Sequence, residues 1–308
     1  MTIEVSASEE LFAPLRNGIE LCYQTFGDPD DDPLLLVMGL GGPMIWWDEQ
    51  LCRRLAAAGF FVIRYDNRDI GRSTTRGPAL GMGTLARGFL TGRAPTPYRI
   101  ADLTQDAFGL LDHLGIPAAH VAGASMGGMI AQSMAIAAPE RVLSLTSIMS
   151  TTGRRSVGHQ HPQLLPMLFR RRRDTREAYV ESSLRLWKVI GSPAYPGDDA
   201  ALSRRAGDTF DRGVDPAGVL RQMAAITTQP DRTKALGSLT MPVLVLHGTA
   251  DKMVDVSGGR ATAAAAHGAE LVLITGMGHD LPAALYDTFT AAIRRNADRT
   301  FGTRPPVS

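Results

Sequence analysis

A serine between two glycines most constrains how this chain can fold. The segment Gly123-Ala124-Ser125-Met126-Gly127 follows an apolar run at residues 119–122 and precedes a helix-forming stretch at residues 129–135. The small flanking residues let a strand and a helix approach closely around the serine, whose own backbone we expect to be strained. Such a turn holds the serine hydroxyl out for attack on a substrate. The sequence therefore predicts a nucleophile elbow centred on Ser125.

Apolar runs and helical segments alternate along the chain. Strands are predicted at residues 19–26, 34–38, 60–65, 119–122, 143–149, 243–246 and 271–274, and helices near residues 48–58, 100–114, 126–138, 257–267 and 284–296. Continuous apolar runs are typical of strands that are buried on both faces of a parallel sheet. The pattern predicts an α/β fold with about seven strands in a mostly parallel central sheet flanked by helices.

One stretch in the second half of the chain interrupts this alternation. Residues 151–237 are helical in composition, rich in arginine and methionine, and punctuated by glycine and proline. We predict that they form a helical cap inserted into a single core, which consists of residues 1–150 and 238–308. The tail at residues 303–308 is expected to be frayed.

The charge balance gives the chain no global attraction to polyanions. The 308 residues carry 32 basic and 31 acidic side chains, for a net charge of +1. We therefore predict no nucleic-acid partner. No apolar stretch approaches the ~20 residues of a bilayer span, and the N-terminus lacks the basic and apolar regions of a secretion signal. These features predict a cytoplasmic protein, and they give no prediction of the oligomeric state.

Neither the cysteines nor the histidines predict a disulfide or a metal site. Cys22 falls in a strand pattern and Cys52 in a helical one, and both are predicted to be buried thiols. His159 and His161 flank one glutamine but have no obvious third and fourth ligands. We predict no metal ion and no diffusible cofactor.

A serine hydroxyl needs a base and an orienting carboxylate to act as a nucleophile at neutral pH. Asp251 follows the strand pattern at residues 243–246, and His279 follows the pattern at residues 271–274 in a glycine-bearing loop. Both are therefore expected at the carboxyl edge of the sheet, where catalytic groups gather. The order serine, acid, histidine is one known order for such a triad. We predict that Ser125, Asp251 and His279 are catalytic.

Each member of this set has an alternative. Ser125 in a tight turn has a purely structural interpretation. Asp251 is also placed to cap the helix that follows it, in which case Asp255 is the reserve acid. The competitors of His279 are the other six histidines, but only His279 combines a late strand with a glycine-flanked loop. His247, at a strand end, is predicted to be a structural hydrogen-bonding residue.

These motifs resemble those of the α/β-hydrolase superfamily over nearly the whole chain outside the cap. Residues 35–39, 64–76 and 276–282 are similar to the aclacinomycin methylesterase-like branch of bacterial carboxylesterases. That resemblance implies hydrolysis of a small ester. The superfamily often has histidine-glycine after its third strand, whereas this chain has Met38-Gly39. Met38 cannot make the loop hydrogen bonds of that histidine.

Two backbone amides are predicted to form the oxyanion hole. Met126 follows the nucleophile at a helix N-terminus, where free N–H groups and the helix dipole favour an anion. Leu40 lies in the glycine-rich loop after Met38-Gly39, which permits close approach to a substrate. Two such donors lower the barrier by several kcal/mol, at about 3 kcal/mol for one donor.

Four further residues are candidate substrate contacts, namely Gly41, Trp46, Met149 and Met253. The tryptophans after the glycine-rich loop, Trp46 and Trp47, are predicted either to line a pocket or to pack the first helix against the sheet. Methionines either give a pocket adaptable walls or fill the core. Arg68, Asp69, Arg72 and Ser73 are predicted to form a loop held by ion pairs and turn hydrogen bonds.

Together these features predict a serine carboxylesterase that hydrolyses small or medium esters through an acyl-enzyme. Alternatives on the same triad are a carbon–carbon bond hydrolase, a cofactor-free haloperoxidase and a ligand-sensing hydrolase-like protein. Residues 164–173 combine apolar side chains with four arginines, which is compatible with a lipid interface. A solvated cap surface is the favoured interpretation of that run, and the expected partner is a small-molecule ester.

Overall fold

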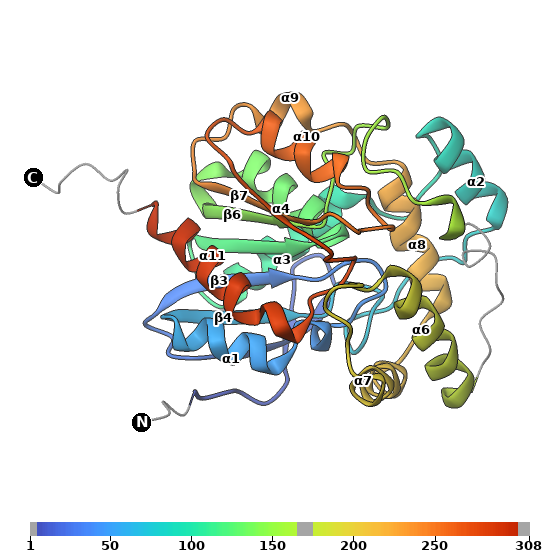
Figure 1. Ribbon diagram of the computed structural model, residues 1–308, viewed down its shortest axis with the longest axis horizontal. Coiled ribbons are helices and arrows are strands. Elements are labelled where there is room, and N and C mark those ends of the chain that lie inside the picture. Colours follow the sequence, from blue (N-terminus) through green and yellow to red (C-terminus); the bar gives the residue numbers. More distant parts are fainter. Residues whose placement is uncertain (1–4, 165–174, 301–308) are drawn as a thin grey trace, which may run out of the picture.

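The apolar runs form one sheet of eight strands within residues 5–164 and 175–300, the part of the chain that a computed structural model describes. The strands are β1 (Leu11–Pro14), β2 (Glu20–Phe26), β3 (Asp32–Val37), β4 (Phe60–Tyr65), β5 (Ala119–Ala124), β6 (Val142–Ile148), β7 (Val243–Gly248) and β8 (Glu270–Ile274). Their order in the sheet is β1-β2-β4-β3-β5-β6-β7-β8 (Figure 1). β2 pairs antiparallel with both β1 and β4. All other neighbouring strands in this order, from β4 and β3 to β7 and β8, are parallel.

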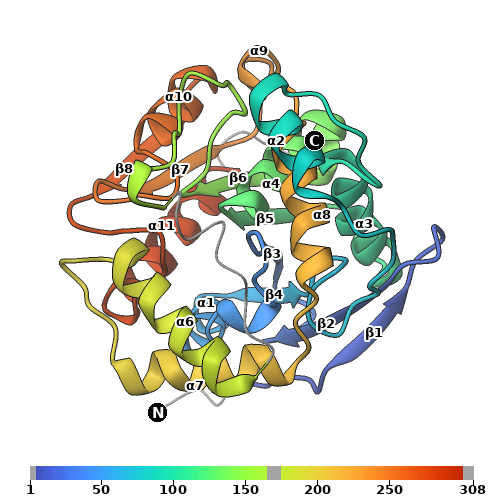
Figure 2. The same ribbon diagram turned by 90° about the vertical axis from the view of Figure 1, so that its right-hand side faces the viewer.

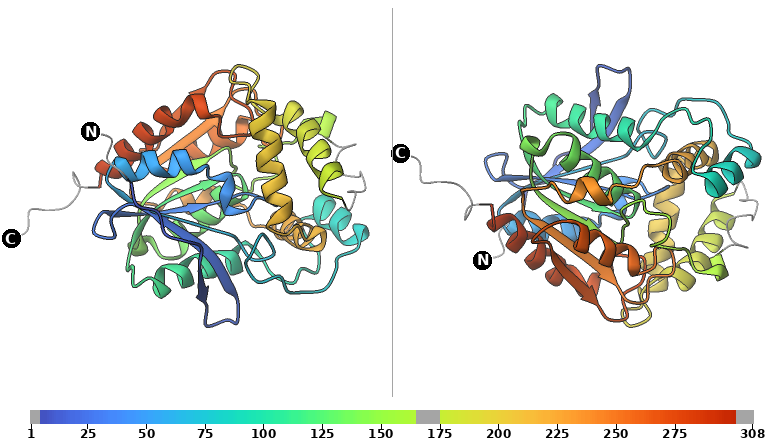
Figure 3. Two further views of the ribbon diagram at one scale, coloured as in Figure 1. Left: turned by 90° about the horizontal axis from the view of Figure 1, so that it is seen from below. Right: turned by 90° about the horizontal axis from the view of Figure 1, so that it is seen from above.

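Helices cover both faces of this sheet, because alternate side chains of a strand point to opposite faces. Leu34 and Leu36 of β3 belong to the core beneath α1 (Glu49–Ala57) and α11 (Tyr286–Asp298). Leu35 and Val37 belong to the opposite core, beneath α3 (Ile100–His113) and α4 (Met126–Ala137). The β1–β2 hairpin, coloured dark blue, extends past the rest of the molecule in both views of Figure 3. The predicted fold, a mostly parallel sheet flanked by helices, is confirmed.

One strand and one α-helix of the predicted core were missed. The prediction of about seven strands is wrong because β1 was missed: it has four residues, three of them exposed, and ends in Pro14. Helix α2 (Met82–Thr91) was missed because glycines at positions 83 and 88 weaken the helical pattern. The helix predicted near residues 284–296 begins with a 3-10 turn, η4 (Ala283–Leu285), and continues as α11.

A group of helices is inserted between β6 and β7. It comprises α6 (Arg176–Ile190), α7 (Asp199–Asp211), α8 (Pro216–Thr227) and α9 (Thr233–Leu236), and we call α6, α7 and α8 the inserted helices. They lie around the carboxyl ends of the parallel strands, and Figure 2 looks onto that end. The remaining elements are η1 (Met44–Trp46), η2 (Pro139–Arg141), η3 (Pro162–Leu164) and α10 (Ser257–Ala265). The four arginines at 170–173, Met167 and the tail at 303–308 lie outside the described residues.

Both cysteines are buried free thiols, as predicted. Burial raises the pKa of Cys22 and of Cys52 to about 12, so neither is a thiolate near neutral pH. Among the described residues, no helix has the length and apolar character that a bilayer crossing requires.

The strand order fixes where a site can form. β3 lies between β4 and β5, so the chain leaves β3 towards one neighbour and returns on its other side. In open α/β sheets such a change of direction opens a crevice at the carboxyl ends of the two strands. Here those ends carry the loop at residues 38–43 and the turn at Ser125.

His120 on β5 makes stability depend on pH. It is 1% exposed, its Nδ1 lies 2.8 Å from Ser144 Oγ, and its ring meets Phe60 edge-on. Burial lowers the pKa of His120 to about 4, whereas an unfolded histidine titrates near 6.5. The unfolded chain therefore binds a proton that the folded chain excludes, and stability falls as the pH decreases from about 6.5 to about 4.

We expect this residue to remove up to about 3 kcal/mol of unfolding free energy over that range. Urea unfolding at about pH 7 and about pH 4.5 measures the effect. His120→Gln should lose less stability on acidification than the wild type, and the exposed His113→Gln should behave like the wild type. The same loss in His120→Gln and wild type would contradict the prediction.

Candidate active site

The turn between β5 and α4 has the geometry predicted for a nucleophile elbow. Ser125 has φ 57° and ψ −118°, a strained backbone for a residue with a side chain. Its N–H donates to the carbonyl of Ile148 at 2.9 Å. A Cβ at Gly123 would lie 2.1 Å from the carbonyl oxygen of Gly127, and one at Gly127 would lie 2.0 Å from that of Val37. Only glycine fits at these two positions.

The structure brings Ser125, Asp251 and His279 together. His279 Nδ1 lies 2.7 Å from Asp251 Oδ2, and His279 Nε2 lies 3.0 Å from Ser125 Oγ. A carboxylate only accepts hydrogen bonds, so Nδ1 carries the hydrogen and Nε2 is free to accept one from the serine hydroxyl. The three groups therefore have the connectivity that a serine nucleophile requires.

The carboxylate of Asp251 is fixed on both oxygens. Oδ1 accepts from the backbone N–H groups of Met253 and Val254 at 2.8 and 2.9 Å, and Oδ2 accepts from His279. The Asp251 residue is 7% exposed. A buried carboxylate with these donors has a single orientation, which in turn sets that of the imidazole.

The two competitors of this pair have other hydrogen-bond partners, although His247 Nε2 also lies 3.5 Å from Asp251 Oδ2. Asp255 accepts from the N–H of Ser257 at 2.9 Å, near the start of α10. His247 Nε2 lies 2.8 Å from the carbonyl oxygen of Val254, and burial lowers the pKa of His247. The predicted structural role of His247 is confirmed, because its ring nitrogen holds the turn that follows Asp251.

The predicted oxyanion amides flank the serine. Met126 is the first residue of α4, and Leu40 follows Gly39, where a Cβ would lie 3.0 Å from that of Ser125. Within the described residues, no hydrogen bond leaves the N–H of Leu40 or of Met126. Both amides are therefore available to a ligand, and their role as oxyanion donors stays a prediction.

Two residues that the sequence did not single out hold the loop that contains Leu40. Asn67 Nδ2 donates to the carbonyl of Met38 at 3.0 Å, and the N–H of Gly41 donates to Gln222 Oε1 at 3.0 Å. Gln222 Nε2 in turn donates to the carbonyl of Arg68 at 2.9 Å. These bonds fix the loop without the histidine that Met38 replaces. Gln222 carries no local signal because its partners are distant in the sequence.

The histidine loop is bound to the end of α6. The N–H of His279 donates to the carbonyl of Ile190 at 2.7 Å, and that of Gly278 donates to Ser192 Oγ at 2.9 Å. Ser192 Oγ donates in turn to Asp280 Oδ1, and burial raises the pKa of Asp280. The segment that follows α6 therefore positions the backbone on both sides of His279.

The sequence assigns this chain to a known protein family. Residues 32–196, more than half of the chain, match the family model of the alpha/beta hydrolase fold. The chain belongs to this family. It is 32% identical over 305 residues to rhodomycin D methylesterase DauP from Streptomyces sp. (strain C5), covering 90% of this chain and 95% of that protein. It is 31% identical to rhodomycin D methylesterase DnrP from Streptomyces peucetius, with the same coverage.

Solved structures share the fold of this α/β hydrolase. The crystal structure of the enol-lactonase from Burkholderia xenovorans LB400 matches with a TM-score of 0.73 and 23% identity, covering 94% of this chain and all of that one. At this identity the likeness concerns the fold. The predicted resemblance to the α/β-hydrolase superfamily and to its methylesterase-like branch is confirmed.

The tryptophans of the α/β hydrolase differ in environment. Trp47 is fully buried in the core beneath α1. Trp46 Nε1 donates to Thr209 Oγ1 of α7 at 3.0 Å, and its ring meets Trp187 of α6 edge-on at 5.2 Å between centroids. The guanidinium of Arg205 lies 4.8 Å from the Trp187 ring centroid. Trp46 thus joins η1, which follows the loop at residues 38–43, to two inserted helices, and its contact with substrate stays a prediction.

The other candidate substrate contacts follow the carboxyl ends of three different strands, β3, β6 and β7. Gly41 has φ 67° and faces α8, where a Cβ would lie 3.4 Å from Val219 Cγ2. Met149 follows β6, has φ 42° and is 3% exposed within the core. Met253 is partly buried, and its Sδ accepts from Gln160 Nε2 at 3.4 Å. Within the part of the chain that the structure describes, none of these positions is hydrogen-bonded to the serine or the histidine, and their substrate roles stay predictions.

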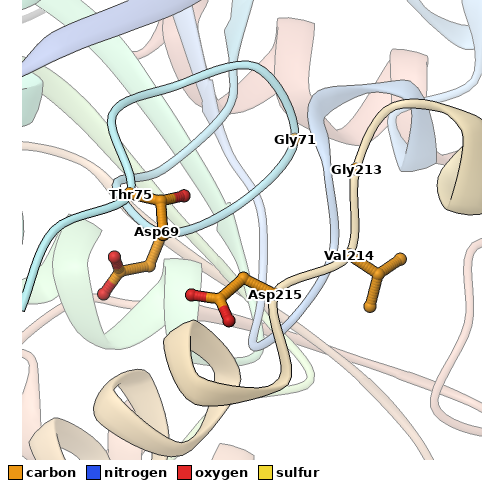
Figure 4. A pocket seen from close by; sticks show the side chains of 6 residues that line it. All are labelled: Asp69, Gly71, Thr75, Gly213, Val214 and Asp215. Carbon is orange, nitrogen blue, oxygen red and sulfur yellow. The ribbon is translucent and has the colours of Figure 1, made fainter. Parts of the chain in front are cut away.

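A hollow lies away from the serine, where α8 meets the loop after β4. Asp69, Gly71, Thr75, Gly213, Val214 and Asp215 line it (Figure 4). Both of its carboxylates bind Arg221, with Asp69 Oδ1 at 2.8 Å and Asp215 Oδ2 at 2.9 Å from Nη2. The hollow is thus the edge of an ion-pair network that joins the inserted helices to the core.

The loop after β4 is held as predicted. Arg68 pairs with Asp106 at 2.5 Å and Arg72 pairs with Glu10 at 2.7 Å. Ser73 Oγ donates to the carbonyl of Asp66 at 2.6 Å. These residues serve the structure of the loop.

Gly127→Ala should disrupt the elbow, because the added Cβ has no room beside the carbonyl of Val37. We expect the free energy of unfolding to fall by about 3 kcal/mol or more. The matched control is Gly83→Ala on α2, where a Cβ meets nothing within 4 Å. Urea unfolding should show that the control is stabilised by up to about 1 kcal/mol. Equal stability of Gly127→Ala and wild type would refute this account of the turn.

Ser192→Ala tests the link between α6 and the histidine loop. It removes the acceptor of the Gly278 N–H and the donor to Asp280, so the imidazole loses part of its support. We expect kcat on an ester substrate to fall about tenfold to a hundredfold with little change in KM. Ser192→Thr, which keeps the hydroxyl, should restore most of kcat. An unchanged kcat in the alanine variant would rule out a positioning role.

Proposed function

We propose that this α/β hydrolase is a serine carboxylesterase that cleaves small or medium carboxylic esters. The observation that carries the proposal is the pair of contacts at His279, 2.7 Å to Asp251 Oδ2 and 3.0 Å to Ser125 Oγ. The likeness to two rhodomycin D methylesterases over 90% of the chain supports an ester as the substrate.

The proposed first step is acyl transfer to the enzyme. His279 Nε2 takes the proton of Ser125 as its Oγ attacks the ester carbonyl, and Asp251 stabilises the imidazolium that forms. The N–H groups of Leu40 and Met126 hold the oxyanion of the tetrahedral intermediate. His279 then gives its proton to the departing alcohol, and an acyl-enzyme remains on Ser125.

The second step reverses the roles of nucleophile and leaving group. A water molecule loses a proton to His279 and attacks the acyl carbonyl, and the second tetrahedral intermediate expels Ser125. The carboxylic acid is released and the proton returns to the serine. Every proton moves through one imidazole, and the cycle calls for no cofactor.

We further propose that residues 151–237 act as a cap that selects the substrate. The inserted helices within this segment lie around the carboxyl ends of the strands, and Trp46 contacts both α6 and α7. Loops and insertions at that end of an α/β sheet commonly set specificity. The core, residues 1–150 and 238–308, would then supply the chemistry.

Ser125→Ala tests the proposed nucleophile. We expect kcat on p-nitrophenyl esters, in a series from acetate to palmitate, to fall by a factor of about 10⁴ to 10⁶. Folding should be retained, because alanine keeps the backbone of the turn. Ser133→Ala, on the neighbouring α4, is the matched control and should keep its activity.

Retention of most activity in Ser125→Ala would contradict the assignment of Ser125 as the nucleophile. A short-chain optimum in the wild type would fit a confined site, and a long-chain optimum would favour lipid-like esters. Absence of turnover on every ester would instead favour a carbon–carbon bond hydrolase or a ligand-sensing protein.

A further inference from the structure

Helix α2 is apolar on two sides. Its inner side packs on α8: Leu85 is 6% exposed, and a Cβ at Gly88 would lie 2.6 Å from Thr227 Oγ1. Its outer side carries the three most exposed large apolar side chains of the described residues, with Met82 at 51%, Phe89 at 60% and Leu90 at 74%. Their spacing of seven and eight residues puts them on one stripe of the helix. Among the described residues, nothing covers this stripe to the extent that its side chains are buried.

The same region is strongly basic although the whole chain is nearly neutral. Between Asp69 and Asp102 the sequence has five arginines and no acidic residue. Arg87 and Arg93 are exposed, and neither forms an ion pair with a described residue. Arg155 adds a further cation, because its Nη2 donates to the carbonyls of Phe89 and Leu90 at 2.5 and 3.0 Å. We call Met82, Ala86, Phe89 and Leu90, with Arg87, Arg93 and Arg155, the α2 face.

A second exposed apolar site shows that this combination is particular to α2. Leu11 and Phe12 on β1 are 42% and 45% exposed, and they directly follow Glu9 and Glu10. Glu10 is paired with Arg72 and with Arg212, so its charge is compensated. The pair provides a control in which apolar exposure is similar and the nearby arginines are held by a carboxylate.

The charge of the α2 face selects its partner. Two copies of the chain that met through this face would bring like charges together, which opposes self-association. A nucleic acid would pair with the arginines and leave the apolar stripe in water. An anionic bilayer satisfies both features, because apolar side chains enter the boundary between headgroups and acyl chains while arginines meet the lipid phosphates. We propose that the α2 face docks this α/β hydrolase onto anionic phospholipid membranes.

The position of α2 connects such docking to the candidate active site. α2 packs on α8, and Gln222 of α8 accepts from the N–H of Gly41 in the loop at residues 38–43. Figures 1 and 2 place α2 and the inserted helices at the same end of the sheet, the one at which the parallel strands terminate. A docked molecule therefore presents the carboxyl end of its sheet to the bilayer, where esters dissolved in lipid are concentrated.

Co-sedimentation of the full chain with vesicles tests the proposal. The wild type should bind vesicles of equal parts phosphatidylcholine and phosphatidylglycerol at low salt, and bind pure phosphatidylcholine about tenfold or more weakly. Phe89→Ser with Leu90→Ser, and separately Arg87→Ser with Arg93→Ser, should each weaken binding to the mixed vesicles by about tenfold or more. Phe12→Ser and the exposed Arg16→Ser are the matched controls and should bind like the wild type.

Turnover of a soluble p-nitrophenyl ester, or the unfolding transition if there is none, verifies that each variant is folded. Failure of the folded wild type to bind anionic vesicles would overturn the proposal. Binding that survives the loss of Phe89 and Leu90 would also overturn it, since charge alone would then suffice. A wild-type dimer that dissociates in the Phe89→Ser, Leu90→Ser variant, without vesicle binding, would assign the face to a second copy instead.

Discussion

Three backbones meet at the turn of Ser125 with no room for side chains between them. The end of β3 passes the start of α4 so closely that position 127 must be glycine, and β5 meets α4 in the same way at position 123. This contact fixes the strained φ of Ser125, the direction of the helix that starts there, and the distance of the glycine-rich loop from the hydroxyl. Because interiors are close-packed and yield little, the strain is held by the whole sheet.

The inserted helices are joined to the core by two different kinds of bond. Near α7 and α8 the junction is ionic: Arg212 pairs with Asp66 at 2.6 Å and Arg221 pairs with Asp69 at 2.8 Å, and all four side chains are buried. Removing one partner of a buried pair costs roughly 3–5 kcal/mol, because the other charge remains without its counter-ion. After α6 the junction consists of hydrogen bonds to the histidine loop. The ionic junction sets where the insertion sits, and the second one sets where the imidazole sits.

Much of the core and the candidate triad could be predicted from the sequence, because their signals are local. An apolar run, a small-residue turn and the residues just after a buried strand are each visible within about ten positions. The exposed four-residue strand β1 and the glycine-containing helix α2 lack such signals, and their formation depends on the neighbours that they pack against.

The residues whose hydrogen bonds hold the site in place were not predicted, for a related reason. Gln222 and Gly41 are 181 positions apart, and Ser192 and Asp280 are 88 apart. Their pairing depends on how the insertion folds back over the sheet, which no local pattern encodes. Of the two alternatives for Trp46 and Trp47, packing in the core is confirmed for Trp47, whereas Trp46 reaches α6 and α7 and its role in a pocket stays a prediction.

The contact between α6 and the histidine loop limits how this enzyme can be rebuilt. A Cβ at Gly278 would lie 2.4 Å from the carbonyl oxygens of both Ile190 and Gly191, so the two segments are fitted to each other at backbone level. In many modular proteins an insertion can be exchanged to change specificity while the chemistry is kept. Here a transplanted insertion would also replace the acceptor of the His279 N–H. The insertion and the position of the imidazole therefore have to evolve together, and a functional chimera must carry residues 190–194 and 276–280 from the same parent.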